Sequence, residues 1–134
     1  MAIHYTIDSA AGILIATLSG DVTAEDFRDY FETSADDRSF RPDLQRLIVI
    51  RDVRSFPKSP QMRAIAARIR PRTADLSVHL AVVTDTVLGR GMTAMIMGNA
   101  GLADRYQEFD DVTSAALWLV LASHRTQSLA AAIA

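Results

Sequence analysis

The fold is decided by one short stretch near the middle of the chain, Leu47-Ile48-Val49-Ile50. It is a continuous aliphatic run with no polar residue to mark a side that faces solvent. Such a run is typical of a strand that is buried on both faces in a mostly parallel sheet. Because parallel strands need long crossover connections, we expect helices before and after this strand.

Upstream of this run, the sequence predicts a hairpin and one helix. Residues 3–8 alternate between apolar and polar, and residues 13–18 form a more apolar second strand after a short turn. Thr23 precedes a segment with aromatic residues at helical spacing, and Asp26 lies three residues later in a capping-box pattern. We therefore expect an antiparallel hairpin followed by a helix that begins after Thr23.

Downstream of the run, helices and strands alternate. Ser59 at the N-cap, followed by Pro60, predicts the start of a helix that ends at Pro71. The remaining predicted elements are a buried strand over 78–83, a helix capped by Asp85, a short strand over 106–109 and a last helix capped by Asp111. The order is β-β-α-β-α-β-α-β-α, which predicts a single-domain α/β sandwich with helices packed on a mixed sheet.

Length and composition limit the classes of protein to which this chain can belong. The 134 residues predict one domain over 1–123, followed by a helical or frayed C-terminal tail over 124–134. The absence of cysteine excludes disulfides and thiolate metal sites, and a net charge of −2 argues against nucleic acid as a partner. The longest apolar run, residues 115–122, is too short for a membrane span. Since no signal peptide is apparent, we expect a cytoplasmic protein.

No set of residues suggests catalysis. His4, His79 and His124 are isolated, without a second ligand at metal-binding spacing, and we expect His79 to bond within the core or at a helix edge. No G-x-S-x-G motif is present. We therefore expect a protein that is not an enzyme, with no catalytic, cofactor or metal site.

Candidate interaction residues cluster in the loops predicted after the strands, where ligands bind in open α/β sheets. These loops are residues 19–23, 51–59 and 84–91, and each precedes a helix N-terminus that suits an anion or a phosphorylated serine. The candidates are Asp52, Arg54, Ser55, Ser59, Arg63, Asp85 and Arg90. Ser59 and Asp85 are equally explained as helix caps, and Asp52 as a residue that bonds the amides of its own loop.

Charge is distributed unevenly along the chain. Residues 21–37 hold seven acidic residues and one arginine, a net charge of −6, whereas residues 51–72 have a net charge of +6. One interpretation is that the basic segment docks to an acidic partner. The other is a solvated face that pairs across the fold with the acidic helix.

Three stretches resemble the SpoIIAA-like proteins of bacteria, which are related in fold to STAS domains (sulfate transporters and anti-sigma-factor antagonists). The resemblance covers Ile3 to Leu119. The stretches are Leu18-Ser19-Gly20-Asp21-Val22-Thr23, Leu47-Ile48-Val49-Ile50-Arg51-Asp52-Val53 and Phe109-Asp110-Asp111-Val112 with Ala116-Leu117-Trp118-Leu119. In STAS-type antagonists a D-S-S-G-like run carries a phosphorylated serine. Here Ser59 matches that serine only by position, and Pro60 stands where glycine is expected.

The resemblance implies a non-enzymatic regulatory or interaction module that binds a protein partner and that Ser59 or Ser55 could switch when phosphorylated. A similarity to the lipid-binding SEC14 fold implies an alternative, a carrier or sensor of a small apolar or lipid-like ligand. In that case we expect the Met-rich third helix and the apolar last helix to line a cavity of about 300 Å³ or more. Under either hypothesis, the last helix and the tail predict a homodimer contact.

Overall fold

The computed structural model describes the backbone of residues 2–133 and the side chains of residues 2–122. It confirms the α/β class, with a five-stranded mixed sheet in the order β1-β2-β3-β4-β5. Strand β1 (Ile3–Asp8) pairs antiparallel with β2 (Ile13–Asp21). The other strands run parallel to β2: β3 (Gln45–Ser55), β4 (Leu80–Thr84) and β5 (Tyr106–Phe109). The predicted order of elements is therefore confirmed.

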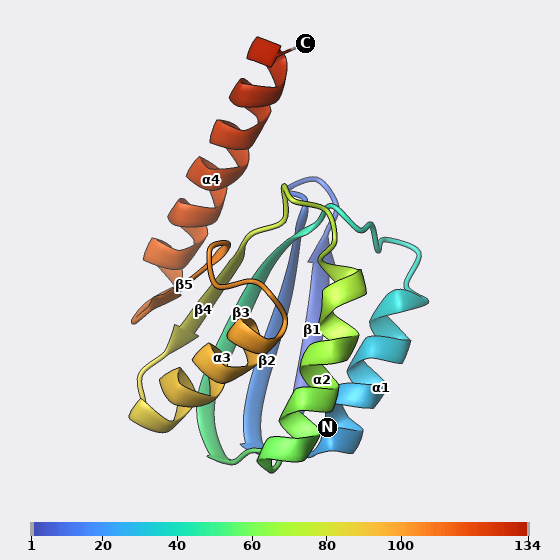
Figure 1. Ribbon diagram of the computed structural model, residues 1–134, viewed down its shortest axis with the longest axis vertical. Helices are drawn as coiled ribbons and strands as arrows, with labels where there is room; N and C mark the ends of the chain where they lie inside the picture. The colour runs from blue at the N-terminus through green and yellow to red at the C-terminus, as the bar shows by residue number, and fades with distance from the viewer. Residues whose placement is uncertain (1, 134) are drawn as a thin grey trace.

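Helices cover both faces of the sheet, as the aliphatic run predicts. Figure 1 shows α1 (Ala24–Ala35), α2 (Ser59–Arg72) and α3 (Val87–Asn99) on one face and α4 (Val112–Ile133) on the other. Successive side chains of β3 point to opposite faces of the sheet. Ile50 packs in the cluster beneath α1, α2 and α3. Val49 packs in a second cluster beneath α4.

The predicted loop after β3 is wrong, because residues 51–55 continue the strand. Strand β2 is also longer than predicted and pairs with this extension, with Gly20 opposite Val53 and Asp21 opposite Ser55. The register shifts at this point, and Asp52 and Gly20 adopt left-handed backbone angles, with φ of 54° and 71°. The irregularity lets pairing continue past the end of the aliphatic run, so the real loop is confined to residues 56–58.

The caps of the helices agree only in part with the predictions. The capping box of α1 is confirmed, because the Asp26 amide donates to Thr23 Oγ1 at 3.2 Å and Asp26 Oδ2 accepts from the Thr23 amide at 2.9 Å. Ser59 is not the N-cap of α2. Lys58 occupies that position, and its amide donates to Gln61 Oε1 at 3.1 Å. The polar side chain that completes this cap therefore comes from inside the helix.

The cap of α3 is also displaced by one residue from its predicted position. Asp85 is exposed and outside the helix, and Thr86 Oγ1 accepts from the Gly89 amide at 3.0 Å. Asp111 does cap α4, since its Oδ1 accepts from the Ser114 amide at 2.8 Å. Among the described residues, no helix is long and apolar enough to cross a membrane.

Candidate functional site

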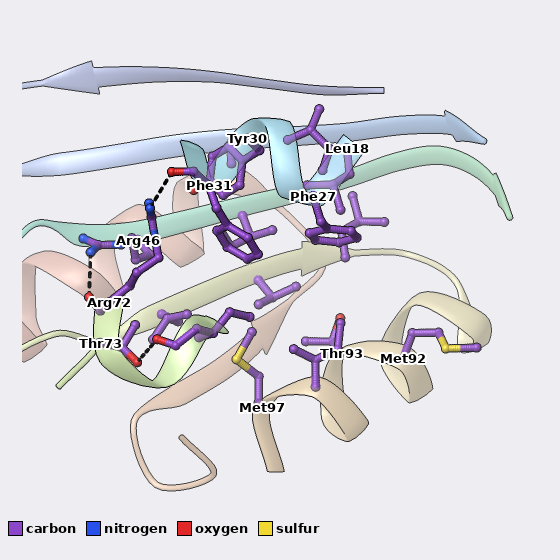
Figure 2. Close-up of a pocket in the computed structure, with 18 of the residues that line it drawn as sticks. Leu18, Phe27, Tyr30, Phe31, Arg46, Arg72, Thr73, Met92, Thr93 and Met97 are labelled. Atoms are coloured by element: carbon purple, nitrogen blue, oxygen red, sulfur yellow. Dashed lines mark hydrogen bonds between the residues drawn. The ribbon is translucent and has the colours of Figure 1, made fainter. Parts of the chain in front are cut away.

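An apolar cavity of about 90 Å³ lies between the sheet and the three helices α1, α2 and α3. Figure 2 shows side chains from the sheet and from these helices converging on it. Its walls include Leu18, Phe27, Tyr30, Phe31, Arg46, Ile48, Ile69, Arg72, Thr73, Val82, Met92, Thr93, Ile96 and Met97. Almost all of the surface that they present to the cavity is apolar.

The floor of the cavity on the sheet combines small and large side chains. Ala16 lies in β2, in register with Ile48 of β3, and its methyl group occupies much less space than Leu18 on the same face. Phe27 and Phe31, one helical turn apart on α1, form the opposite wall. Ala16 and the two aromatic rings thus line the same space from the sheet and from α1.

Two arginine side chains lie at one end of the cavity (Figure 2). Arg46, on β3, is only 3% exposed and donates to the carbonyl oxygens of Leu44 and Arg72. Arg72, at the end of α2, donates to the Phe31 carbonyl at 3.0 Å and to Ser34 Oγ at 2.8 Å. Each guanidinium group thus donates to one carbonyl near a helix C-terminus, where the helix dipole favours positive charge.

Aromatic rings and burial define the electrostatics of this end. The Arg46 and Arg72 guanidinium carbons lie 5.5 and 4.9 Å from the centre of the Phe40 ring, within cation–π range. Burial lowers the pKa of Arg46 to about 10 and also lowers the pKa of Arg72. Arg46 is therefore still charged at neutral pH.

Neither arginine forms an ion pair within residues 2–122. Asp43 is an acidic residue whose charge favours protonated Arg46, but its carboxylate pairs with Arg41 at 3.2 Å. The other ion pairs of the described side chains involve Arg28, Arg54 and Arg90. Arg46, which is buried, and Arg72, which is half-buried, therefore have no carboxylate partner in this part of the chain.

A surface hollow between α1 and α2 adjoins the cavity. It is lined by Phe31, Glu32, Ala35, Asp36, Ala67, Arg68, Pro71 and Arg72. Phe31 and Arg72 line both spaces, and Arg68 stacks on the outer side of this wall with its guanidinium carbon 5.2 Å from the centre of the Phe31 ring. Phe31 and Arg72 thus form the wall between the cavity and the hollow, so their displacement would join the two spaces.

The interaction residues that the sequence suggests lie away from this cavity and form two separate groups. Arg54 and Ser55 contact Asp21, at 3.4 Å from Nη2 and 3.0 Å from Oγ, at the extended ends of β2 and β3. Arg90, on α3, pairs with Asp110 after β5 at 2.8 Å. The other candidates, Asp52, Ser59, Arg63 and Asp85, are exposed.

The expected pairing between the acidic and basic segments is seen at one place only. Among the described side chains, the Arg54–Asp21 pair is the one that joins residues 21–37 to residues 51–72, and it does not involve the two helices. Arg68 and Arg72 of α2 instead stack on Phe31 of α1. The helices are joined here by cation–π contacts and by the hydrogen bonds from Arg72 to α1, and not by the predicted charge pairing.

The expected walls of the ligand cavity are partly confirmed, but the expected size of about 300 Å³ or more is wrong, because the cavity has a volume of about 90 Å³. Met92 and Met97 of α3 line it, as the Met-rich segment predicts. The prediction for the last helix is wrong, because α4 packs on the opposite face of the sheet. His79 lies at a helix edge as expected, with its ring centre 5.8 Å from that of Trp118.

The basic residues at the end of the cavity were not among the predicted site residues. Arg46 directly precedes the aliphatic run, and Arg72 belongs to a basic segment whose sequence is typical of a solvent-exposed surface.

The described residues contain no group of three His, Cys, Asp or Glu side chains that could hold a metal ion. In comparisons with known proteins, no family model and no curated protein matches this chain.

Proposed function

We propose that this protein is a non-enzymatic binding module that holds a small molecule in the cavity between its sheet and α1, α2 and α3. The observation that supports this most directly is the apolar cavity itself, because protein cores are usually packed without voids of this size. At about 90 Å³, it is smaller than the roughly 300–1,000 Å³ of drug-sized ligand sites. It is also smaller than the roughly 150 Å³ cavity that binds benzene. The ligand is therefore an aliphatic molecule of a few carbon atoms.

The relation to SpoIIAA-like and STAS proteins is part of this proposal. The opening hairpin and the mostly parallel sheet are compatible with it, and a regulatory module of this kind would respond to its ligand through α2. This helix contributes Ile69, Arg72 and Thr73 to the cavity wall, and it also carries the exposed Arg63 of the predicted interaction surface. A change in occupancy would thus act on the helix that we propose to meet a protein partner.

Filling the cavity from the floor is expected to abolish ligand binding. Ala16 lines the cavity, so Ala16→Leu adds three carbon atoms at its floor and reduces the room for a ligand. In a ¹H–¹⁵N NMR titration with n-butanol, the unmodified protein should show saturable shifts at amides around the cavity. Ala16→Leu should show none, while its spectrum remains that of a folded protein.

Thr17→Leu is the matched control, because it places the same side chain on the same strand but on the opposite face of the sheet. It should bind n-butanol like the unmodified protein. Val82→Leu, a smaller addition to the cavity floor from β4, should weaken binding if Ala16→Leu does not fold. Saturable shifts that persist in a folded Ala16→Leu protein would overturn the proposal.

A further inference from the structure

We infer that the outer face of α1 and α2 binds a second copy of this chain, so that α1 of each copy lies over α2 of the other. The contact joins an acidic row, consisting of Asp29, Glu32 and Asp36, to a basic row, consisting of Arg63, Arg68 and Arg70. This inference names the partner that the proposed function leaves open for α2. It does not require that the cavity holds a ligand.

The two rows lie side by side, because α1 and α2 are neighbours that run in the same direction (Figure 1). Two surface hollows between these helices show which of their residues lie at the same level. Ala24 and Gln61, near the starts of the two helices, line one hollow, and Glu32 and Arg68 line the other. The acidic row therefore runs beside the basic row along this face.

The charges of the two rows are not neutralised within the described part of the chain. None of the six side chains forms an ion pair within residues 2–122. Arg68 stacks on Phe31, and Arg70 Nη2 donates to the Asn99 carbonyl at 2.6 Å, so both cations are positioned by uncharged groups. Asp29 is half-buried, and the other five residues of the rows are exposed. These charges are therefore open to a partner molecule.

A second copy of the chain satisfies this arrangement through symmetry. A surface of one sign of charge would select a partner of the opposite sign, whereas adjacent rows of both signs are complementary to themselves. In a two-fold contact each chain uses the same surface. If the two-fold axis runs parallel to the helices, between α1 and α2, the acidic row of each copy meets the basic row of the other. An axis across the helices would place α1 over α1, where like charges repel, so charge complementarity also selects the orientation.

The levels of the rows predict which side chains meet. A two-fold axis parallel to the helices brings each residue over a residue of the second copy at the same level. Glu32 thus lies over Arg68 of the second copy, since the two residues line the same hollow in one chain. Asp29 precedes Glu32 by about one helical turn, and Arg63 precedes Arg68 by a little more, so Asp29 and Arg63 form the second pair.

The surface of α2 between these two arginines suits the approach of a helix. Ala64 and Ala67 lie there and are exposed. Their methyl groups let α1 of the second copy come close, so that Arg63 and Arg68 can reach its carboxylates from either side with their long side chains. The contact consists mainly of exposed ion pairs and is therefore expected to depend strongly on salt.

The first test is sedimentation velocity of the full-length chain carrying Leu121→Glu. This substitution places a charge at an exposed position of the last helix, on which the sequence predicts a homodimer contact. Because α4 lies on the opposite face of the sheet, it leaves the face of α1 and α2 unchanged (Figure 1). We expect a dimer at about 0.05 M NaCl, with a dissociation constant at least about tenfold higher at about 0.5 M NaCl.

Two charge-reversal variants in the same background identify the surface. One carries Asp29→Lys and Glu32→Lys, and the other carries Arg63→Glu and Arg68→Glu. Each should be monomeric alone at low salt, because like charges then meet in both halves of the contact. An equimolar mixture should form a dimer, because both halves then join opposite charges.

The matched control carries Asp85→Lys and Asp104→Lys, which change the net charge as much as the α1 variant does. Both residues are exposed and lie outside α1 and α2, so this variant should still form the dimer at low salt.

Three results would each overturn the inference: a Leu121→Glu chain that stays monomeric at low salt, a reversal variant that dimerises alone, or a mixture of the two that stays monomeric. Circular dichroism establishes that the variants are folded. If Arg63→Glu with Arg68→Glu does not fold, Arg63→Glu alone should still weaken the dimer, since Arg63 is exposed. None of these results bears on the binding of n-butanol, which tests the cavity separately.

Discussion

Leu119→Ala is expected to lower the free energy of unfolding by about 2–5 kcal/mol. Leu119 is fully buried, and together with Ala115 it packs α4 against Leu47 and Val49 of β3. Because α4 is the helix on this face of the sheet, the cavity left by the missing side chain has few neighbours that could close it (Figure 1). Urea denaturation followed by circular dichroism measures the loss.

Leu117→Ala, one half-turn away on the same helix, is the control. Its side chain is 59% exposed, so the change in unfolding free energy should stay within about 0.5 kcal/mol. A negligible effect of Leu119→Ala would contradict the placement of α4.

We also propose that the outer face of α4, with exposed Leu117, Val120 and Leu121, forms the homodimer contact that the sequence predicts. The expected contribution of the tail depends on side chains that lie outside the described residues.

Gly89→Ala is expected to destabilise the protein by about 1–3 kcal/mol, although alanine is the better helix former. A Cβ atom at this position would lie 2.3 Å from Thr84 Oγ1 and 3.0 Å from Thr86 Oγ1. Thr84 is 1% exposed at the end of β4, and its β-branched side chain has little freedom to move away. The first turn of α3 therefore packs against the sheet at a distance that only glycine allows.

Gly91→Ala tests the same substitution two residues further along α3, where a Cβ atom would meet nothing within 4 Å. It should stabilise the protein by about 0.5–1 kcal/mol, the usual gain for alanine over glycine within a helix. Thermal unfolding of the two variants should thus move in opposite directions. Equal stabilisation by both would show that α3 does not approach Thr84 closely.

The order of helices and strands was predictable because each of them is indicated by a pattern of residues within its own stretch of sequence. The aliphatic run at residues 47–50 indicates a strand that is buried on both faces, and the structure places helices on both. The extension of β3 was not predictable in this way. Residues 51–55 are mostly polar and read as a loop, and they become a strand because β2 continues beside them across an irregular register at Asp52.

The cavity was less predictable than the fold, since it depends on how distant elements pack together. The methionines of α3 gave a usable signal, and Met92 and Met97 do line the cavity. Nothing in the basic segment distinguishes Arg72 from its exposed neighbours. Its inward orientation follows from the meeting of the C-terminal ends of α1 and α2, where the Phe31 carbonyl and Ser34 Oγ accept its hydrogen bonds. Such a contact appears only once the helices are placed on the sheet.

Xenon binding tests the central claim, that the protein has a ligand cavity in its core, most directly. Xenon enters dry apolar cavities and can be located by its electron density in a pressurised crystal. We predict one xenon site between the sheet and α1, α2 and α3, bounded by Ile48, Val82 and Ile96. The substitution Ala16→Leu should abolish xenon binding at this site. A crystal of the unmodified protein with no xenon among these residues would contradict the account.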